Sequence, residues 1–113
     1  MKIKNKTGRT IALYINEQWE TFFPEGYPVT VKESLQPCDS IGIQISQYSY
    51  DGINGLPDKE KDVIIVVDKD VAIKCWQTLR DDVVYMHAPI VRDDKYRSVA
   101  SMILVCWQNA RFF

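Results

Sequence analysis

Hydrophobic and polar residues alternate in short segments along the first half of the chain, a pattern typical of half-buried strands. Residues 2–4 and 10–15 flank the turn residues Thr7-Gly8-Arg9, and we expect them to form a hairpin. Residues 29–33 and 42–50 alternate in the same way. The pattern therefore predicts a series of short strands joined by turns.

The middle of the chain carries two clearer signals. Residues 51–58 hold two glycines and one proline, which predicts a loop. Residues 63–67 are an unbroken β-branched run, Val-Ile-Ile-Val-Val, typical of a strand that is covered on both faces.

A helix is predicted directly after this strand, over residues 69–79. Asp68 precedes it, and its carboxylate can accept hydrogen bonds from the amides of the first turn. With 3.6 residues per turn, the apolar positions share one face about 140° wide, from which only Ile73 is left out. The residues expected on this buried face are Val71, Ala72, Cys75, Trp76 and Leu79.

The last third returns to extended structure. Residues 83–85 and 89–91 are short extended pieces, and residues 98–107 form a long apolar strand. A length of 113 residues is usual for one domain, so we expect residues 1–113 to form a single domain. The fold class is α+β: a mainly antiparallel, twisted sheet of five to seven strands with one packed helix.

Charge and cysteine content limit the partners and the cellular compartment that we expect for the protein. Fourteen basic and fifteen acidic residues give a net charge of −1, which argues against nucleic acid as a partner. Three widely spaced cysteines fit a reducing compartment, and residues 1–6 lack the apolar stretch of a signal peptide. The longest apolar run near the C-terminus is far shorter than the roughly 20 residues of a membrane span. We expect a cytoplasmic protein with no membrane partner.

Catalytic and metal-binding patterns are weak. His87 is the sole histidine, and Cys75 and Cys106 both lie in apolar patterns typical of core cysteines. No Cys or His pair has the short spacing of zinc ligands, and no glycine-rich phosphate loop occurs. We expect no enzymatic activity, no metal and no cofactor; a small hydrolase that uses His87 is the alternative.

The candidate binding residues lie in two arginine–aspartate motifs. Arg80-Asp81-Asp82 and Arg92-Asp93 stand at the ends of predicted elements. Their guanidinium groups can converge on an anion by bidentate hydrogen bonding, or they can pair with the neighbouring aspartates. Trp19, between Gln18 and Glu20, is a further candidate because we expect it to be exposed.

Several of these motifs occur together in one known pattern. The motif Gly55-Leu56-Pro57 precedes the apolar strand and helix, and Arg80-Asp81-Asp82, Pro89 and Val91-Arg92-Asp93 follow. In this respect the chain resembles a family of small uncharacterised phage and bacterial proteins, over about residues 1–105. It departs from the family at Asp68, where serine is usual, and at Lys95-Tyr96, where glycine is usual. The resemblance implies a phage or mobile-element setting and no particular activity.

The function expected from these features is binding without catalysis. In a phage or mobile element, the protein would inhibit a host defence protein or sequester a small anionic or nucleotide ligand. A virion or assembly component that forms a homo-oligomer is the other alternative, because the ends of the chain are rich in aromatic residues.

Overall fold

The computed structural model describes residues 1–38, 45–87, 91–92, 94–95 and 98–108, with the backbone alone for residues 33–38 and 45–51. In chain order its elements are β1 (Lys2–Asn5), β2 (Ile11–Ile15), β3 (Gln18–Phe22), β4 (Thr30–Cys38), β5 (Ile45–Asn54), β6 (Val63–Val66), α1 (Lys69–Gln77), β7 (Val83–His87), β8 (Val91–Arg92), β9 (Ser98–Ser101) and β10 (Ile103–Cys106).

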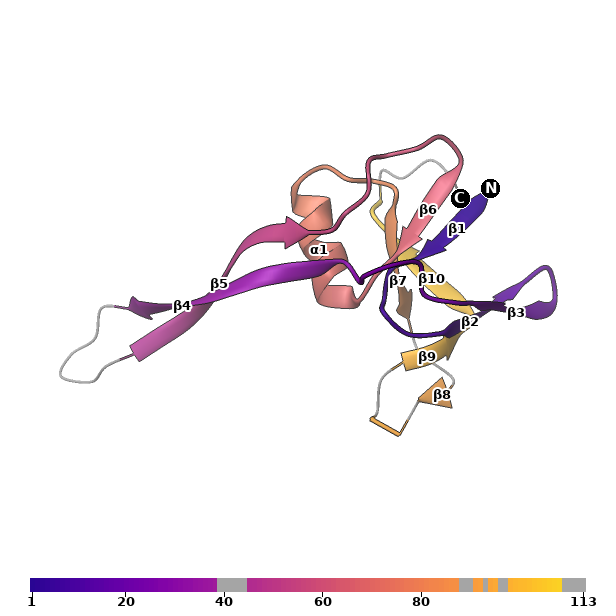
Figure 1. Ribbon diagram of the computed structural model, residues 1–113, viewed down its shortest axis with the longest axis horizontal. Coiled ribbons are helices and arrows are strands. Elements are labelled where there is room, and N and C mark those ends of the chain that lie inside the picture. The colour runs from indigo at the N-terminus through magenta and orange to yellow at the C-terminus, as the bar shows by residue number, and fades with distance from the viewer. Residues whose placement is uncertain (39–44, 88–90, 93, 96–97, 109–113) are drawn as a thin grey trace.

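The strands form three sheets. The first has the order β1-β6-β7-β10, in which β1, β6 and β7 are parallel and β10 is antiparallel to β7. The second has the order β3-β2-β9-β8 and contains one parallel pair, β2 with β9. The third is the hairpin β4-β5, which projects from the body along the 58 Å long axis of the molecule (Figure 1).

The predicted α+β class with one helix is confirmed, but the prediction of five to seven mainly antiparallel strands is wrong: the described residues form ten strands in mixed sheets.

The first sheet is the central layer of the body. One face packs on α1, with Ile65 and Val67 against Val71, Ala72 and Cys75. The opposite face packs on the second sheet (Figure 1), where the buried residues are Ile11, Leu13, Ile64, Val66 and Val84. Strand β6 is therefore covered on both faces, as its β-branched run predicted.

The predicted hairpin of residues 2–4 and 10–15 does not form, because the chain leaves the first sheet after β1 and enters the second. The Asn5 side chain, 1% exposed, holds this crossing. Its Oδ1 accepts hydrogen bonds from the backbone and hydroxyl of Thr7, and its Nδ2 donates to the carbonyls of Arg9 and Phe22. The hairpin partner of β2 is β3, across a turn in which Asn16 and Glu17 have φ angles of 50° and 64°.

Two later boundaries also differ from the prediction. Strand β5 continues through Asn54, so the loop predicted from residue 51 begins at Gly55. The predicted strand over residues 98–107 is two strands, β9 and β10, which belong to different sheets and meet at Met102. The Ser101 hydroxyl holds this corner, because it donates to the carbonyl of His87 at 2.5 Å and accepts from the amide of Ile103 at 3.1 Å.

Helix α1 lies where the pattern placed it, with two corrections. Asp68 is at the N-cap position but makes no side-chain capping hydrogen bond, since its carboxylate pairs with Arg9. Leu79 is 74% exposed, because the helix ends at Gln77 and Leu79 adopts a left-handed conformation with φ of 66°. Trp76 is half-buried, and its Nε1 donates to the Val83 carbonyl at 2.8 Å.

Candidate functional site: a cationic cleft

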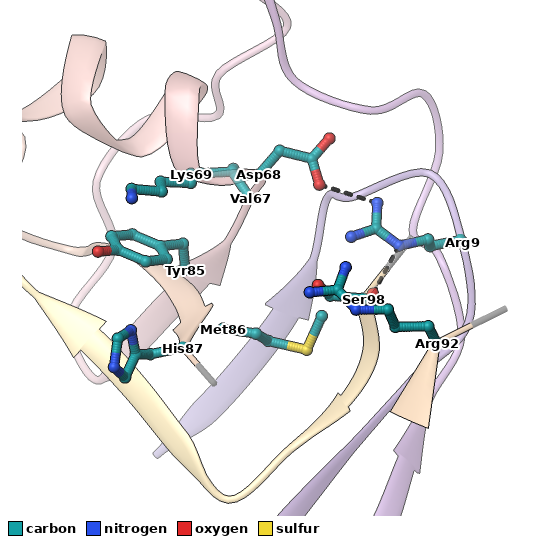
Figure 2. Close-up of a pocket in the computed structure, with 9 residues that line it drawn as sticks. All are labelled: Arg9, Val67, Asp68, Lys69, Tyr85, Met86, His87, Arg92 and Ser98. Carbon is teal, nitrogen blue, oxygen red and sulfur yellow. Dashed lines mark hydrogen bonds and ion pairs between the residues drawn. The ribbon is translucent and has the colours of Figure 1, made fainter. Parts of the chain in front are cut away.

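A cleft of about 300 Å³ lies where the parallel strands of the first sheet end. Strands β1, β6 and β7 run in the same direction, so their carboxyl ends share one edge, where ligands of α/β sheets commonly bind. The loop after β1, the β6–α1 junction and the end of β7 all contribute to the cleft, and β8 and β9 close it from the second sheet. Its lining residues are Arg9, Val67, Asp68, Lys69, Tyr85, Met86, His87, Arg92 and Ser98 (Figure 2).

Positive charge dominates this lining. Of the lining residues that the structure describes, Arg9, Lys69 and Arg92 carry positive charge, and Asp68 is the one carboxylate. Both Arg9 and Arg92 line the cleft, and in the view of Figure 2 their guanidinium groups lie on the same side of it. Since the whole chain has a net charge of −1, the cleft is a local concentration of positive charge that its composition does not reveal.

Arg9 is held rigidly. Its Nε donates to the Ser98 carbonyl at 2.8 Å, and its Nη1 donates to Asp68 Oδ1 at 2.8 Å. The Arg9 side chain is only 13% exposed, whereas that of Asp68 is 50% exposed. The loop after β1 thus fixes one guanidinium at the wall of the cleft before any ligand arrives.

The other side of the cleft is aromatic. Tyr85 is half-buried, and its ring packs on Trp76 with centroids 5.7 Å apart and an angle of 38° between the planes. Lys69 Nζ lies 5.9 Å from the centroid of the Tyr85 ring, a cation–π contact. His87 is exposed below Tyr85 in the view of Figure 2.

The residues predicted from the sequence are distributed over three places. Arg92 lines the cleft, but Arg80, Asp81 and Asp82 lie beyond the C-terminal end of α1, the end away from the cleft. The two arginines therefore do not converge on one site. Asp93 lies outside the described residues.

Arg80 makes a structural ion pair. Its Nε and Nη2 donate to the two oxygens of Asp82, both at 2.9 Å, and Nη2 also donates to the Pro57 carbonyl at 2.8 Å. Asp82 is 2% exposed, and its hydrogen bond raises the pKa of Arg80 above the ordinary value, although burial acts in the opposite direction. Asp81 pairs with Lys59. Of the two alternatives that the sequence left open for Arg80, anion binding or pairing with a neighbouring aspartate, this geometry is the aspartate pairing.

Trp19 is 47% exposed, as expected, and packs edge-on against Tyr14 with ring centroids 5.3 Å apart. It lines a separate apolar groove of about 390 Å³ on the outer face of the second sheet, together with Val91 and Val99. The groove is adjacent to the cationic cleft in sequence, because Val91 precedes Arg92 and Val99 follows Ser98.

Arg9, Lys69 and Tyr85 were not predicted as site residues. They are 60 and 16 residues apart in sequence, and no motif connects them. The one available signal was position: Asp68 and Lys69 stand where a buried strand runs into a helix, and ligands of parallel α/β sheets commonly bind at the carboxyl ends of the strands.

No group of three or more metal-ligating side chains occurs among the described residues. Within the same part of the chain, no helix has the length and apolar character needed to cross a membrane. No family model, curated protein or solved structure matches the chain. Function is therefore inferred from the geometry of the cleft.

Proposed function

We propose that the protein is a non-catalytic binding protein that holds a small anionic ligand in the cationic cleft. The observation that carries this proposal is the arrangement of Arg9, Lys69 and Arg92 around a cleft of about 300 Å³, in which Asp68 is the one carboxylate among the described lining residues. Guanidinium groups recognise phosphate and carboxylate by paired, charge-assisted hydrogen bonds. A volume of this size is at the lower end of the range for ligand pockets.

Binding rather than catalysis is supported by the position of the nucleophiles. Cys75 is fully buried against the first sheet, and burial raises its pKa to about 11, so that the thiol is protonated at neutral pH. Cys106 packs between the two sheets of the body. Of the cysteines whose side chains are described, neither lines the cleft beside His87.

The family resemblance extends this proposal to a biological setting. In a phage or mobile element, a protein of this kind would act by removing a small anionic signal from the host. Blocking a host protein directly is the other form of the same proposal. The cleft favours sequestration, because its charged groups line a concave site and not a flat surface.

Isothermal titration calorimetry with inorganic phosphate and ribose 5-phosphate tests the proposal. We expect saturable binding that weakens as salt is added, since the contacts are charge-assisted. Arg92→Gln should weaken it by about 10- to 100-fold, the effect of losing hydrogen bonds to a charged group. The matched control is Lys61→Gln, which removes one positive charge from an exposed side chain outside the cleft.

Two results would overturn the proposal. One is the absence of saturable binding of either probe at concentrations up to about 10 mM with the fold intact. The other is an equal loss of affinity in the Arg92 and Lys61 variants, which would mean that the anions respond only to overall charge.

A further inference from the structure

The two sides of the cleft differ in chemistry. One side carries the guanidinium groups of Arg9 and Arg92, and the other carries the ring of Tyr85 with Lys69 and His87 around it (Figure 2). A ligand that fills the whole cleft and uses both sides joins an anionic group to a flat, aromatic group. We propose that this ligand is a nucleotide, with its phosphate between Arg9 and Arg92 and its base against Tyr85; this inference rests on the proposed function.

The phosphate position follows from the way Arg9 is held. Its Nε and Nη1 are engaged by Ser98 and Asp68, and its Nη2 makes no hydrogen bond within the described part of the chain. In Figure 2 this nitrogen points into the cleft, on the side where the guanidinium of Arg92 lies. A phosphate oxygen placed between the two groups would accept hydrogen bonds from both.

The base position follows from the support behind Tyr85. Trp76 packs on its ring, and Trp76 is itself fixed by the hydrogen bond from Nε1 to the Val83 carbonyl at 2.8 Å. Tyr85 thus presents a rigid ring at the wall of the cleft, next to the half-buried side chain of Met86. Stacking of a base on such an aromatic side chain tolerates any base, because every base has a π face.

The size of the cleft selects a single nucleotide. About 300 Å³ accommodates one small ligand, and Arg9, Lys69 and Arg92, the basic lining residues that the structure describes, form a cluster too short to follow a polynucleotide backbone. The ligand class is therefore a nucleoside phosphate, not a DNA or RNA strand.

Calorimetric titration of the full chain with four probes tests this inference: AMP, ribose 5-phosphate, adenosine and the oligonucleotide dA10. We expect AMP to bind at least about ten-fold more tightly than ribose 5-phosphate, because base stacking adds to the phosphate contacts. AMP should also bind at least about ten-fold more tightly than adenosine, which lacks the phosphate. The oligonucleotide should bind no more tightly per site than AMP.

Substitutions of Tyr85 test whether the base binds against this ring. Tyr85→Leu should remove the advantage of AMP over ribose 5-phosphate and leave ribose 5-phosphate affinity unchanged, whereas Tyr85→Phe should preserve both. The matched control is Tyr27→Leu, since Tyr27 is 90% exposed and does not line the cleft. If Tyr85→Leu fails to fold, saturation-transfer NMR with the wild-type protein gives the same information: the adenine protons of AMP should receive more saturation than the ribose protons.

The outcomes separate the inference from the proposed function. Equal affinities for AMP and ribose 5-phosphate, or a folded Tyr85→Leu variant that keeps the preference for AMP, would overturn the nucleotide inference and leave the anion site intact. Stronger saturation of the ribose than of the adenine would do the same. Tighter binding of the oligonucleotide per site would identify a single strand as the ligand class instead. Failure of all phosphate-bearing probes to bind would overturn both proposals.

Discussion

Replacement of Arg80 by alanine is expected to lower the free energy of unfolding by about 3–5 kcal/mol, the cost of leaving one partner of a buried ion pair without the other. The structure supports the upper part of the usual range for single substitutions, because Asp82 is 2% exposed and both of its carboxylate oxygens accept from Arg80 at 2.9 Å. The substitution also removes the hydrogen bond to the Pro57 carbonyl, which ties the loop after β5 to the start of β7.

Urea unfolding followed by tryptophan fluorescence measures this loss, and thermal unfolding should show a fall in Tm of about 10–20 °C. The control is Lys59→Ala, which breaks the neighbouring pair with Asp81; there the lysine side chain is 58% exposed, so the cost should stay below about 1 kcal/mol. The double variant Arg80→Ala/Asp82→Ala should be more stable than Arg80→Ala alone, because no buried carboxylate is left without a partner. Similar losses in the Arg80 and Lys59 variants, or unchanged stability with reduced ligand affinity in Arg80→Ala, would refute the assignment of Arg80 to the scaffold.

Three further predictions concern the body of the protein. Trp76→Ala should lower the free energy of unfolding, measured by urea titration, by about 3 kcal/mol, whereas Leu79→Ala should change it little because that side chain is 74% exposed. Equal losses in the two variants would show that the buried face of the helix is assigned wrongly. Asn5→Ala should lower the free energy of unfolding by about 2–4 kcal/mol, because it leaves backbone groups between β1 and β2 without hydrogen-bond partners. A change below about 1 kcal/mol would show that water replaces the side chain. Cys75 should resist alkylation at pH 8, because burial raises its pKa to about 11; peptide mass spectrometry should find it modified only when urea unfolds the chain, and fast labelling of the folded protein would contradict its burial.

The sequence predicted those elements whose burial pattern can be read from their own residues, without knowledge of the elements they pack against. The β-branched run of β6 requires apolar contacts on both faces, and α1 supplies them on one face and the second sheet on the other. The spacing of Val71, Ala72 and Cys75 placed the buried face of the helix without knowledge of its partner. The flanking polar residues of Trp19 predicted its exposure in the same local way.

Strand pairing and the site were decided by the tertiary structure. Backbone hydrogen bonds are the same for every strand, so an alternating segment such as β1 does not specify that its partner is β6, some sixty residues away, rather than β2. The Asn5 side chain holds the chain where it crosses between the sheets, and its hydrogen bond to the Phe22 carbonyl forms only after the two sheets have met. The same reason separates the two arginines: Arg80 and Arg92 stand beside aspartates that look alike in sequence, but packing buries Asp82 against one and opens a cleft beside the other. The cleft itself joins Arg9, Lys69, Tyr85 and Arg92 because three parallel strands end at one edge, and only the assembled sheet creates that edge.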